Sequence, residues 1–508
     1  MSPSSRRSFL AGAGCAAAAC AFPDRLLGQS PSLAAIAHDP LRPAYHLLPP
    51  HNWMNDPNGP IFWKGKYHLY YQLNPEAAVW GDMHWGHAIS TDMVHWHHEP
   101  IALAPTPGGP DSEGCFSGSA VVFHGVPTML YTGVQNAPRD QSTIRDGDNH
   151  LRETQLLATA EGDDLLRWRK RAEPVLAAPP AGMDVTGFRD PCPWREEDGW
   201  YLGVGSGERG KGGCVLLYRS SDLRHWDYLH KLAEGQWTGK QAANPVDSGE
   251  MWECPDFFAL GKTTDKRERR VLLYSTQGKS LWTVGHYDRS THLFKSETEA
   301  RPLDHGAYYA PKSFLAADGR RILWGWIQET RPQAAYSAAG WAGAMSLPRV
   351  LSLDDSGRLA IAPAKETESL RGPLAGAHIR ADSPYKLKLP HLRRELRVRA
   401  AEPHCTLTVR LAVKGAEVWK LELNGSDSAV RCGDVQFTTA PPHRPAELRI
   451  FLDGSVVETF VNTSDALTSR VYSVHPDETE IVVEVAGTGT ADVESWPLRA
   501  ISRDRLTT

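Results

Sequence analysis

Short apolar runs separated by turn residues dominate the chain, and no long stretch repeats its apolar positions with a helical period. Between about residues 50 and 350, runs rich in aromatic and β-branched residues end at clusters of Gly, Pro, Asp and Asn. This pattern is typical of β-strands joined by tight turns. We therefore expect an all-β protein.

Five of these runs resemble one another and indicate an internal repeat. Each is an aromatic strand that follows a turn, as residues 67–72 follow Lys64-Gly65-Lys66. The unit is about 60 residues long, and Asp-(Met/Leu)-x-x-Trp recurs at Asp92, Asp164 and Asp222. Five such units favour a five-bladed β-propeller, whereas a β-sandwich explains the repeat less well. A polar or aromatic residue stands near the start of each unit: Asp56, Ser117, Asp190, Glu253 and the Tyr308-Tyr309 pair.

The pattern changes after the last repeat. Residues 361–372 are a short polar connector, and alternating runs follow, two of them joined by the hairpin signal Asp453-Gly454. We expect a leader and linker at 1–37, the propeller at 38–360, the connector at 361–372, and a C-terminal β-sandwich at 373–508.

The first residues are typical of an export signal. Arg6-Arg7 stands in a twin-arginine pattern, and the small-residue apolar run 11–21 follows, with a candidate cleavage site at residues 19–21. The run is too short to span a bilayer, so we expect a folded protein exported to the periplasm or the exterior. A lipid anchor at Cys15 or Cys20 is a less favoured alternative, and no other stretch is apolar enough for a membrane helix.

Charge and composition narrow the choice of partner. The net charge is −5 and charged residues make up 23%, which does not indicate a nucleic-acid partner, whereas 17 Trp suit stacking on sugar rings. The six cysteines beyond the leader show no Cys-x-x-Cys spacing, which argues against zinc or a redox dithiol. Cys405 and Cys432 form one candidate pair; the alternative is that these two and the others, Cys115, Cys192, Cys214 and Cys254, are all free, buried thiols.

Three acidic motifs are candidates for chemistry: Asn55-Asp56-Pro57, Arg189-Asp190-Pro191 and Glu253-Cys254-Pro255. The first lies within residues 53–59, where we expect a tight turn that holds Asp56 at a strand end beside Trp53. Alone, each motif is more often an ordinary turn or a surface acid. If the first strand of each blade lines the channel, the three acids meet at one mouth.

Paired carboxylates are what glycoside hydrolysis requires, one as nucleophile or base and one as proton donor. Trp252 and Pro255 give Glu253 an apolar setting, which suits an acid of raised pKa. Asp56 stands among turn amides that can stabilise its anion, which suits the nucleophile.

An ordered set of motifs resembles glycoside hydrolase family 32, which contains invertases, inulinases and levanases. It comprises residues 53–59, 71–72, 80–81, 85–92, 116–119, 188–191 and 252–256, and it resumes at 453–460 in the second domain. The resemblance implies a five-bladed propeller joined to a β-sandwich. It also implies a retaining β-fructofuranosidase that releases terminal fructose from sucrose, inulin or levan, with no metal or other cofactor.

The resemblance also implies the role of each acid. Asp56 would attack the anomeric C2 of a fructofuranosyl unit, with roughly 5–5.5 Å between its carboxyl and that of Glu253. Glu253 would protonate the leaving oxygen and then activate water. Asp190, with Arg189 beside it, would hold the fructose hydroxyls and stabilise the oxocarbenium-like transition state.

Further residues match family positions that shape the fructose pocket: Asn55, Gln72, Trp80, Phe116, Ser117 and, unless the alignment slips to Trp324, Trp326. Core packing is the alternative for these residues, or, for the amides, satisfaction of strand hydrogen bonds. Five histidines lack companion acids, so we interpret them as loop and strand surface and not as metal ligands: His84, His87, His95, His97 and His98.

Two other functions remain open at this point. A fructosyltransferase would use the same intermediate and pass fructose to a sugar acceptor. A non-catalytic carbohydrate-binding propeller would be expected to lack at least one acid, and all three are present. The sequence leaves open the preferred substrate, exo or endo action and the oligomeric state.

Overall fold

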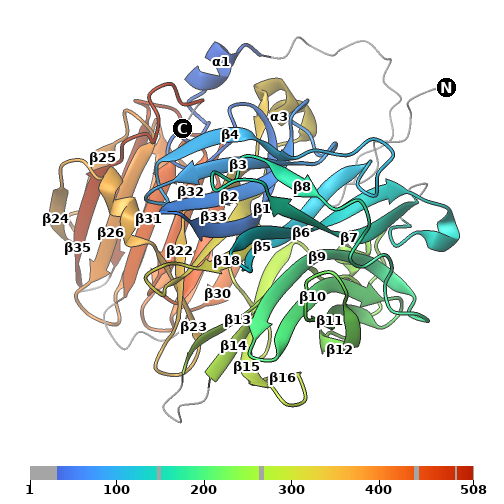
Figure 1. The fold of residues 1–508 in the computed structure, drawn as a ribbon. Helices are drawn as coiled ribbons and strands as arrows, with labels where there is room; N and C mark the ends of the chain where they lie inside the picture. The colour runs from blue at the N-terminus through green and yellow to red at the C-terminus, as the bar shows by residue number, and fades with distance from the viewer. Residues whose placement is uncertain (1–30, 146–149, 263–267, 440–445, 487–488, 507–508) are drawn as a thin grey trace.

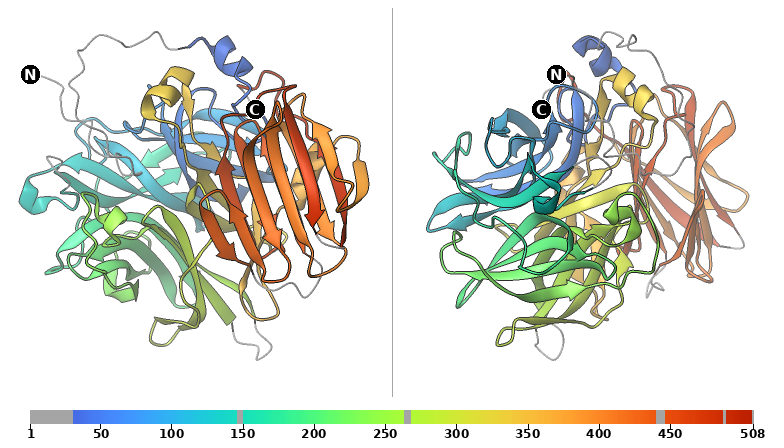
Figure 2. Two further views of the ribbon diagram at one scale, coloured as in Figure 1. Left: turned by 180° about the vertical axis from the view of Figure 1, so that it is seen from behind. Right: turned by 90° about the vertical axis from the view of Figure 1, so that its right-hand side faces the viewer.

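The structure, a computed structural model, describes residues 31–145, 150–262, 268–439, 446–486 and 489–506. In these residues the strands form seven sheets, five of four or five strands and two of six. Five sheets surround a common axis (Figure 1), and the other two pack against one side of that ring (Figure 2). The expected five-bladed β-propeller followed by a β-sandwich is confirmed.

Each blade is an antiparallel sheet whose first strand lies nearest the axis. These innermost strands contact one another in chain order, and the last packs back against the first. The innermost strands are buried along most of their length, as is the neighbouring strand β10, whose sequence is a nearly continuous apolar run. The blade strands are β1 (Asn52–Trp63), β2 (Lys66–Asn74), β3 (His84–Ser90) and β4 (Trp96–Leu103); β5 (Gly114–Phe123), β6 (Val126–Asn136), β7 (Leu151–Ala160) and β8 (Trp168–Lys170); β9 (Val185–Glu196), β10 (Gly199–Glu208), β11 (Gly212–Ser220) and β12 (Asp227–Glu234); β13 (Glu253–Lys262), β14 (Glu268–Thr276), β15 (Lys279–Asp288), β16 (Leu293–Ser296) and β17 (Arg301–Pro302); and β18 (Tyr308–Leu315), β19 (Arg321–Ile327), β22 (Arg349–Leu353) and β23 (Leu359–Pro363).

A short segment closes the ring of blades. β20 (Trp341–Ala342) pairs in parallel with β1 of the first blade, and β21 (Ala344–Met345) pairs antiparallel with β19 of the fifth. The segment 341–345 thus joins the first and last blades through backbone hydrogen bonds. It covers strand edges of β1 and β19 that would otherwise be unpaired.

The sandwich follows a short connector. β23 runs through the predicted boundary at residue 360, and the 3₁₀ helix η2 (Lys365–Leu370) leads into the second domain. Its strands alternate buried and exposed positions, since each sheet has one face in the core. One sheet has the order β24 (Ala375–Arg380), β35 (Thr490–Pro497), β26 (Arg393–Ala400), β31 (Glu447–Asp453), β32 (Val456–Val461), β33 (Asp465–Arg470), and the other β25 (Tyr385–Lys388), β34 (Thr479–Ala486), β27 (Thr406–Val413), β28 (Ala416–Asn424), β29 (Ala429–Cys432), β30 (Val435–Thr438).

Helices are few and short in the described residues. α1 (Leu33–His38) buries Ile36 in a cluster with Leu48 and Trp341, just after the predicted twin-arginine segment, which lies outside the described residues. The remaining helices are η1 (Arg139–Gln141), α2 (Pro245–Ser248) and α3 (Gln333–Ala339). No helix among the described residues is both long and apolar enough to cross a bilayer.

The recurring Asp-(Met/Leu)-x-x-Trp sequence has a structural role. It forms the turn between the third and fourth strands of the first three blades. Oδ1 of Asp222, for example, accepts the backbone N–H groups of Arg224 and His225, each at 2.9 Å. The residue after each Asp has a positive φ, 61° at Leu223. The motif therefore caps a turn, away from any proposed chemistry.

Two local predictions have different outcomes. The Asp453-Gly454 hairpin is confirmed, with Asp453 opposite Val456. The tight turn expected at residues 53–59 is wrong, because these residues lie inside β1. Two register shifts against β2 bend the strand there, so the turn-forming residues serve β-bulges. The described cysteines are all free, Cys405 and Cys432 included.

A buried charge network joins the two domains. His46 precedes the first blade and contacts two carboxylates of the sandwich. Its Nδ1 lies 2.9 Å from Asp453 Oδ2, and its Nε2 lies 2.9 Å from Glu458 Oε1. Arg349 of the fifth blade donates to Oε2 of Glu458 at 2.5 Å and to Asp304 at 2.9 Å. Burial disfavours the charge on His46, but the two carboxylates outweigh it and raise its pKa to about 9. Burial likewise disfavours the charge on Glu458, but Arg349 and His46 lower its pKa to about 2.

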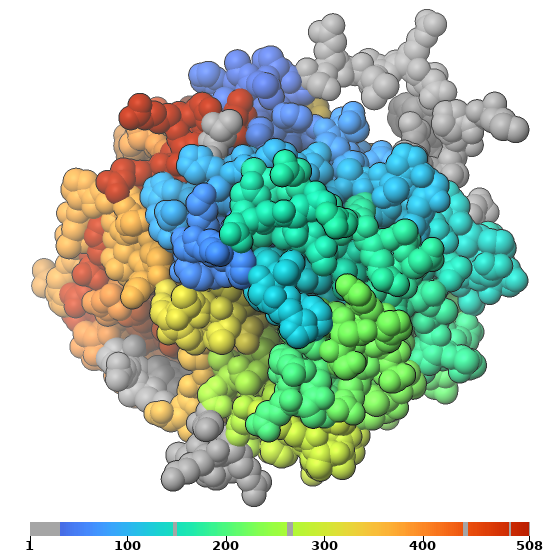
Figure 3. Space-filling model, viewed as in Figure 1, coloured from blue at the N-terminus to red at the C-terminus, as the bar shows by residue number. Residues whose placement is uncertain are grey.

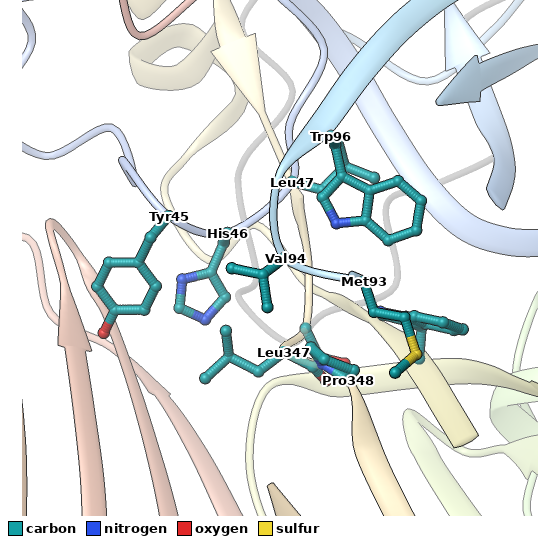
Figure 4. Close-up of a pocket in the computed structure, with 10 residues that line it drawn as sticks. Tyr45, His46, Leu47, Met93, Val94, Trp96, Leu347 and Pro348 are labelled. Atoms are coloured by element: carbon teal, nitrogen blue, oxygen red, sulfur yellow. The ribbon is translucent and has the colours of Figure 1, made fainter. Parts of the chain in front are cut away.

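The packing around this network leaves almost no space. Figure 4 shows His46 beside Tyr45, facing Val94 of the first blade and Leu347 of the fifth. The cavity between them is about 10 Å³, room for at most one water molecule. The space-filling view shows the two domains in contact on this face (Figure 3). The network therefore fixes the sandwich against the propeller.

This network predicts a loss of stability at alkaline pH. The pKa of His46 is higher in the folded protein than its ordinary 6.5, so its contribution is complete below pH 6.5 and is lost as pH rises through about 9. The loss amounts to about 3 kcal/mol. We expect Tm to fall over that window in the wild type. A His46→Gln variant should have a lower Tm at pH 6 and a flatter profile between pH 6.5 and 9. The same alkaline slope in both proteins would contradict this assignment.

Candidate active site

All five innermost strands carry one extra residue at the same level of the ring. The register shifts lie between Met54 and Pro57 of β1, Phe116 and Gly118 of β5, Arg189 and Cys192 of β9, Glu253 and Asp256 of β13, and Tyr309 and Lys312 of β18. A bulge breaks the simple alternation of side chains and re-aims one of them. Here the bulges bring the predicted acids of three blades together.

The last three bulges share an unusual backbone. Asp190, Cys254 and Ala310 have φ values of 65°, 49° and 49°, and each precedes a proline. Such left-handed residues are costly without glycine and cluster at functional sites. The residues near the starts of these units are not strictly equivalent: Glu253 is level with Arg189, and Cys254 is level with Asp190.

Asp56 is half-buried, and side chains hold its carboxylate. Oδ2 accepts the Ser117 hydroxyl at 2.6 Å and the Cys254 thiol at 3.5 Å, and Oδ1 accepts Asn55 Nδ2 at 3.0 Å. The expected turn amides are therefore not its donors. Burial raises the pKa of Asp56, the donors from Ser117 and Asn55 oppose the rise, and the charge of Glu253 adds to it.

Asp190 is the most deeply buried of the three acids, 3% exposed. Its Oδ2 accepts the backbone N–H of Cys254 at 2.8 Å and the thiol of the same residue at 3.5 Å. Burial raises its pKa to about 7; Arg189 opposes this, and the charges of Glu253 and Asp56 add to it. Near neutral pH this carboxyl is therefore partly protonated.

Glu253 takes part in a chain of polar contacts from neighbouring blades. Its Oε1 accepts Arg189 Nε at 3.1 Å and Nη2 at 2.9 Å, and its Oε2 accepts the Tyr309 hydroxyl at 2.7 Å. Arg189 is held from behind by Glu153 of β7 at 2.8 Å. The immediate setting of the Glu253 carboxyl is therefore polar, in contrast to the apolar setting expected from its sequence neighbours. Its side chain is 23% exposed.

Aromatic side chains of the first, second and fifth blades lie beside the acids. Trp53 packs against Trp326 with ring centroids 5.7 Å apart, and Trp80 meets the edge of Phe116 at 5.8 Å. These four rings belong to one apolar cluster, in which Trp80 and Trp326 are only half-buried. Their partly exposed faces are suited to sugar C–H groups.

The structure shows how the side chains at two of the predicted binding positions pack. Trp324 is buried against Phe314 and Trp96 in a different cluster, so the alignment to Trp326 is the one that reaches the site. Gln72 is buried and donates Nε2 to the Cys115 carbonyl at 3.0 Å. It fixes the strand that carries Phe116 and Ser117, and no hydrogen bond joins its side chain to the three acids in the described structure.

Three further residues of this site were not predicted: Cys254, Tyr309 and Glu153. Cys254 and Tyr309 stood in quoted motifs, but neither was given a role. Glu153 is the one charged residue in the stretch 153–158, which the structure shows to be fully buried in β7. An acid alone in such a stretch is the signal that could have identified it. Its Oε2 also accepts the Phe188 N–H at 2.7 Å, which explains its burial.

The histidine interpretation needs one correction. His95 and His97 are exposed, and His84 and His98 are half-buried, but His87 is fully buried. It stacks on Tyr70 at 4.3 Å and lies 3.0 Å from His68, so burial lowers the pKa of His87 well below its ordinary value. In the described residues, no group of three or more His, Cys, Asp or Glu side chains is arranged to hold a metal ion.

Comparisons with known proteins agree with this architecture. Residues 46–363 match the glycosyl hydrolases family 32 N-terminal domain, and residues 420–498 match the family 32 C-terminal domain. The chain is 37% identical to sucrose-6-phosphate hydrolase of Escherichia coli, over 86% of this chain and 91% of that protein. It is 36% identical to raffinose invertase of Escherichia coli, over 85% and 89% of the two chains.

Solved structures give the same result. The Bombyx mori GH32 β-fructofuranosidase BmSUC1 superposes with a TM-score of 0.77 at 31% identity, covering 92% of this chain and 96% of that one. Fructan 1-exohydrolase IIa of Cichorium intybus superposes with a TM-score of 0.74 at 28% identity, covering 91% and 98%. Variants of these two enzymes have been solved with sucrose and with 1-kestose, respectively.

Proposed function

The chain belongs to glycoside hydrolase family 32, and we propose that it is a retaining β-fructofuranosidase that releases terminal fructose from sucrose or fructans. The observation that carries this proposal is the meeting of Asp56, Asp190 and Glu253, from three blades, at the bulges of one ring end. Paired carboxylates with an adjacent aromatic wall supply the groups that fructoside hydrolysis needs.

Asp56 is the nucleophile in this proposal. Its Oδ2 already accepts two donors, whereas among the described residues Oδ1 accepts Asn55 alone, so Oδ1 keeps electron density for attack. Oδ1 forms a bond to C2 of the fructosyl unit as the bond from C2 to the leaving oxygen breaks. The electron pair of that bond goes to the leaving oxygen, and a covalent fructosyl-enzyme forms.

Glu253 is the general acid and then the general base. It gives its proton to the leaving oxygen in the first step and takes one from water in the second, as water attacks C2 and frees Asp56. Arg189 and Tyr309 fix the orientation of its carboxyl. Two inversions at C2 give net retention. This route requires roughly 5–5.5 Å between the two carboxyls.

Asp190 binds the fructose unit and stabilises the transition state, and Arg189 stabilises the cluster of acids. The carboxylate of Asp190 accepts fructose hydroxyls and offsets the positive charge that develops at C2 and the ring oxygen. Arg189 lies between Glu153 and Glu253, and its charge limits the repulsion among the acids. Asn55, Ser117, Trp80, Phe116 and Trp326 line the fructose pocket, and Gln72 supports it from behind.

Product analysis tests this function. Purified protein is incubated separately with sucrose, inulin and levan, and the products are chromatographed and their anomeric form followed by NMR. We expect free fructose, released first as the β-anomer. An α-anomer as first product would contradict retention, and no fructose from any substrate would contradict the function. A ladder of oligosaccharides would replace exo action with endo action, and products longer than the substrate would indicate transfer.

We further propose export by the twin-arginine route to the periplasm or the exterior. The support is Arg6-Arg7 followed by the small-residue apolar run. Changing Arg6-Arg7 to Lys-Lys should leave the enzyme activity in the cytoplasmic fraction. Undiminished activity outside the cytoplasm in that variant would exclude this route.

A further inference from the structure

Cys254 lies where two of the three acids meet. Its Sγ is 3.5 Å from Oδ2 of Asp56 and 3.5 Å from Oδ2 of Asp190, and its backbone N–H donates to the latter at 2.8 Å. The thiol is buried, and it belongs to the fourth blade, whereas the two carboxylates come from the first and third. A single sulfur atom thus joins three blades.

This thiol keeps its proton. Burial raises the pKa of Cys254 well above its ordinary value, and the charges of Asp190, Asp56 and Glu253 raise it further, against the opposing effect of Lys312. These four groups face it from β9, β1, β13 and β18, the innermost strands that surround it. Cys254 is therefore an S–H donor and not a thiolate nucleophile.

One S–H serves two acceptors. It donates to Asp56 or to Asp190 at any moment, and each carboxylate has a second donor: the Ser117 hydroxyl for Asp56 and the backbone N–H of Cys254 for Asp190. A thiol is a weak, long donor, so it restrains both oxygens without strongly neutralising either. The thiol thus restrains the two Oδ2 atoms, whereas Oδ1 of Asp56 accepts Asn55 Nδ2 at 3.0 Å and has no contact with the thiol.

The backbone does not require a thiol at this position. Ala310, at the equivalent bulge of the fifth blade, has the same φ of 49° and is also followed by proline, yet its side chain has no polar atom. The left-handed conformation is thus compatible with a methyl group. The thiol occurs at the bulge where two carboxylates converge.

We propose that Cys254 is a positioning residue for fructosyl transfer: its thiol holds Oδ2 of Asp56 beside Asp190, so that Oδ1 of Asp56 faces C2 of the substrate. This inference rests on the proposed function, because it presupposes attack by Asp56. The chemistry itself stays with Asp56 and Glu253. Cys254 acts through the orientation of the nucleophile.

The test compares Cys254→Ala and Cys254→Ser with a matched control, Cys192→Ala. Cys192 is a buried thiol on β9 that lies 3.6 Å from Asp256 Oδ1, and no hydrogen bond joins its side chain to Asp56 or Asp190 in the described residues. We expect Cys254→Ala to lower kcat on sucrose about tenfold relative to Cys192→Ala, with KM changed less than about twofold, because only the geometry of attack is lost. Cys254→Ser should recover part of kcat, since a hydroxyl can donate.

Two results would overturn the inference. In one, Cys254→Ala keeps a kcat within about twofold of Cys192→Ala; in the other, Cys254→Ser is no better than Cys254→Ala, which would mean that the thiol only fills space. Tm is measured for every variant, so that a loss of folded protein is separated from a loss of rate. The proposed function stands or falls on fructose release by the wild type, whereas this inference depends on the ratios among the variants.

Discussion

Replacing Asp56 by Asn is expected to abolish turnover while the protein stays folded. The amide cannot form the covalent fructosyl-enzyme, so kcat on sucrose should fall on the order of 10⁴-fold or more. The fold should persist because Asn keeps an oxygen that can accept the Ser117 hydroxyl, which lies 2.6 Å from Oδ2 in the wild type. The charge lost is one that burial already disfavours, since the pKa of Asp56 is raised. Steady-state kinetics and a thermal melt check both parts.

The matched control is Asp164→Asn, the same chemical change at an exposed turn of the second blade, where Asp164 accepts the backbone N–H of Leu166. It should leave kcat within about twofold of the wild type. Turnover by purified Asp56→Asn above about one-hundredth of the wild-type kcat would refute Asp56 as the nucleophile. Mass spectrometry after denaturing a working mixture should show a fructosyl adduct in the wild type and none in Asp56→Asn.

Replacing Glu253 by Gln should have an effect that depends on the leaving group. With sucrose, whose leaving alkoxide needs a proton, kcat/KM should fall on the order of 10³-fold. With an aryl fructoside of low leaving-group pKa, formation of the fructosyl-enzyme needs little acid help. Its initial burst of phenol should then be nearly as fast as in the wild type, with slow turnover afterwards because the base is missing.

Glu161→Gln is the control for this pair of substrates. Glu161 forms an exposed ion pair with Arg169 of β8, the outermost strand of the second blade, and in the described residues no hydrogen bond joins it to the three acids. Both substrates should therefore react as in the wild type. Equal losses on sucrose and on the aryl fructoside in Glu253→Gln would exclude the acid role. The burst amplitude distinguishes the two steps, because it reports the first without the second.

Strand pattern and motif order were sufficient to predict the architecture. Aromatic runs and turn residues are local features, and their repeat of about 60 residues reflects one blade after another, so they indicated the propeller without knowledge of any contact. The shift to alternating strands after residue 372 likewise indicated the sandwich. The acids Asp56, Asp190 and Glu253 stood in quoted motifs, and the structure places them at one end of the ring.

The surroundings of each acid could not be read from neighbours in sequence. Trp252 and Pro255 flank Glu253 in the chain, but its carboxyl meets Arg189 and Tyr309 from other blades. Residues 53–59 looked like a turn, because their composition is the same for a turn and for a bulged strand. A single extra residue in a strand reverses which side chains face the channel, and the period-two pattern does not reveal it.

The sequence by itself determined the all-β fold, the number of blades and the second domain, and it proposed Asp56, Asp190 and Glu253 as the three acids. The tertiary structure alone decided that Cys254 joins Asp56 to Asp190, that Glu153 supports Arg189, and that His46 binds the sandwich to the propeller. The physical reason is separation along the chain: these pairs lie between 36 and 412 residues apart. Their contacts depend on ring closure and bulge register, which arise only when all the blades are packed.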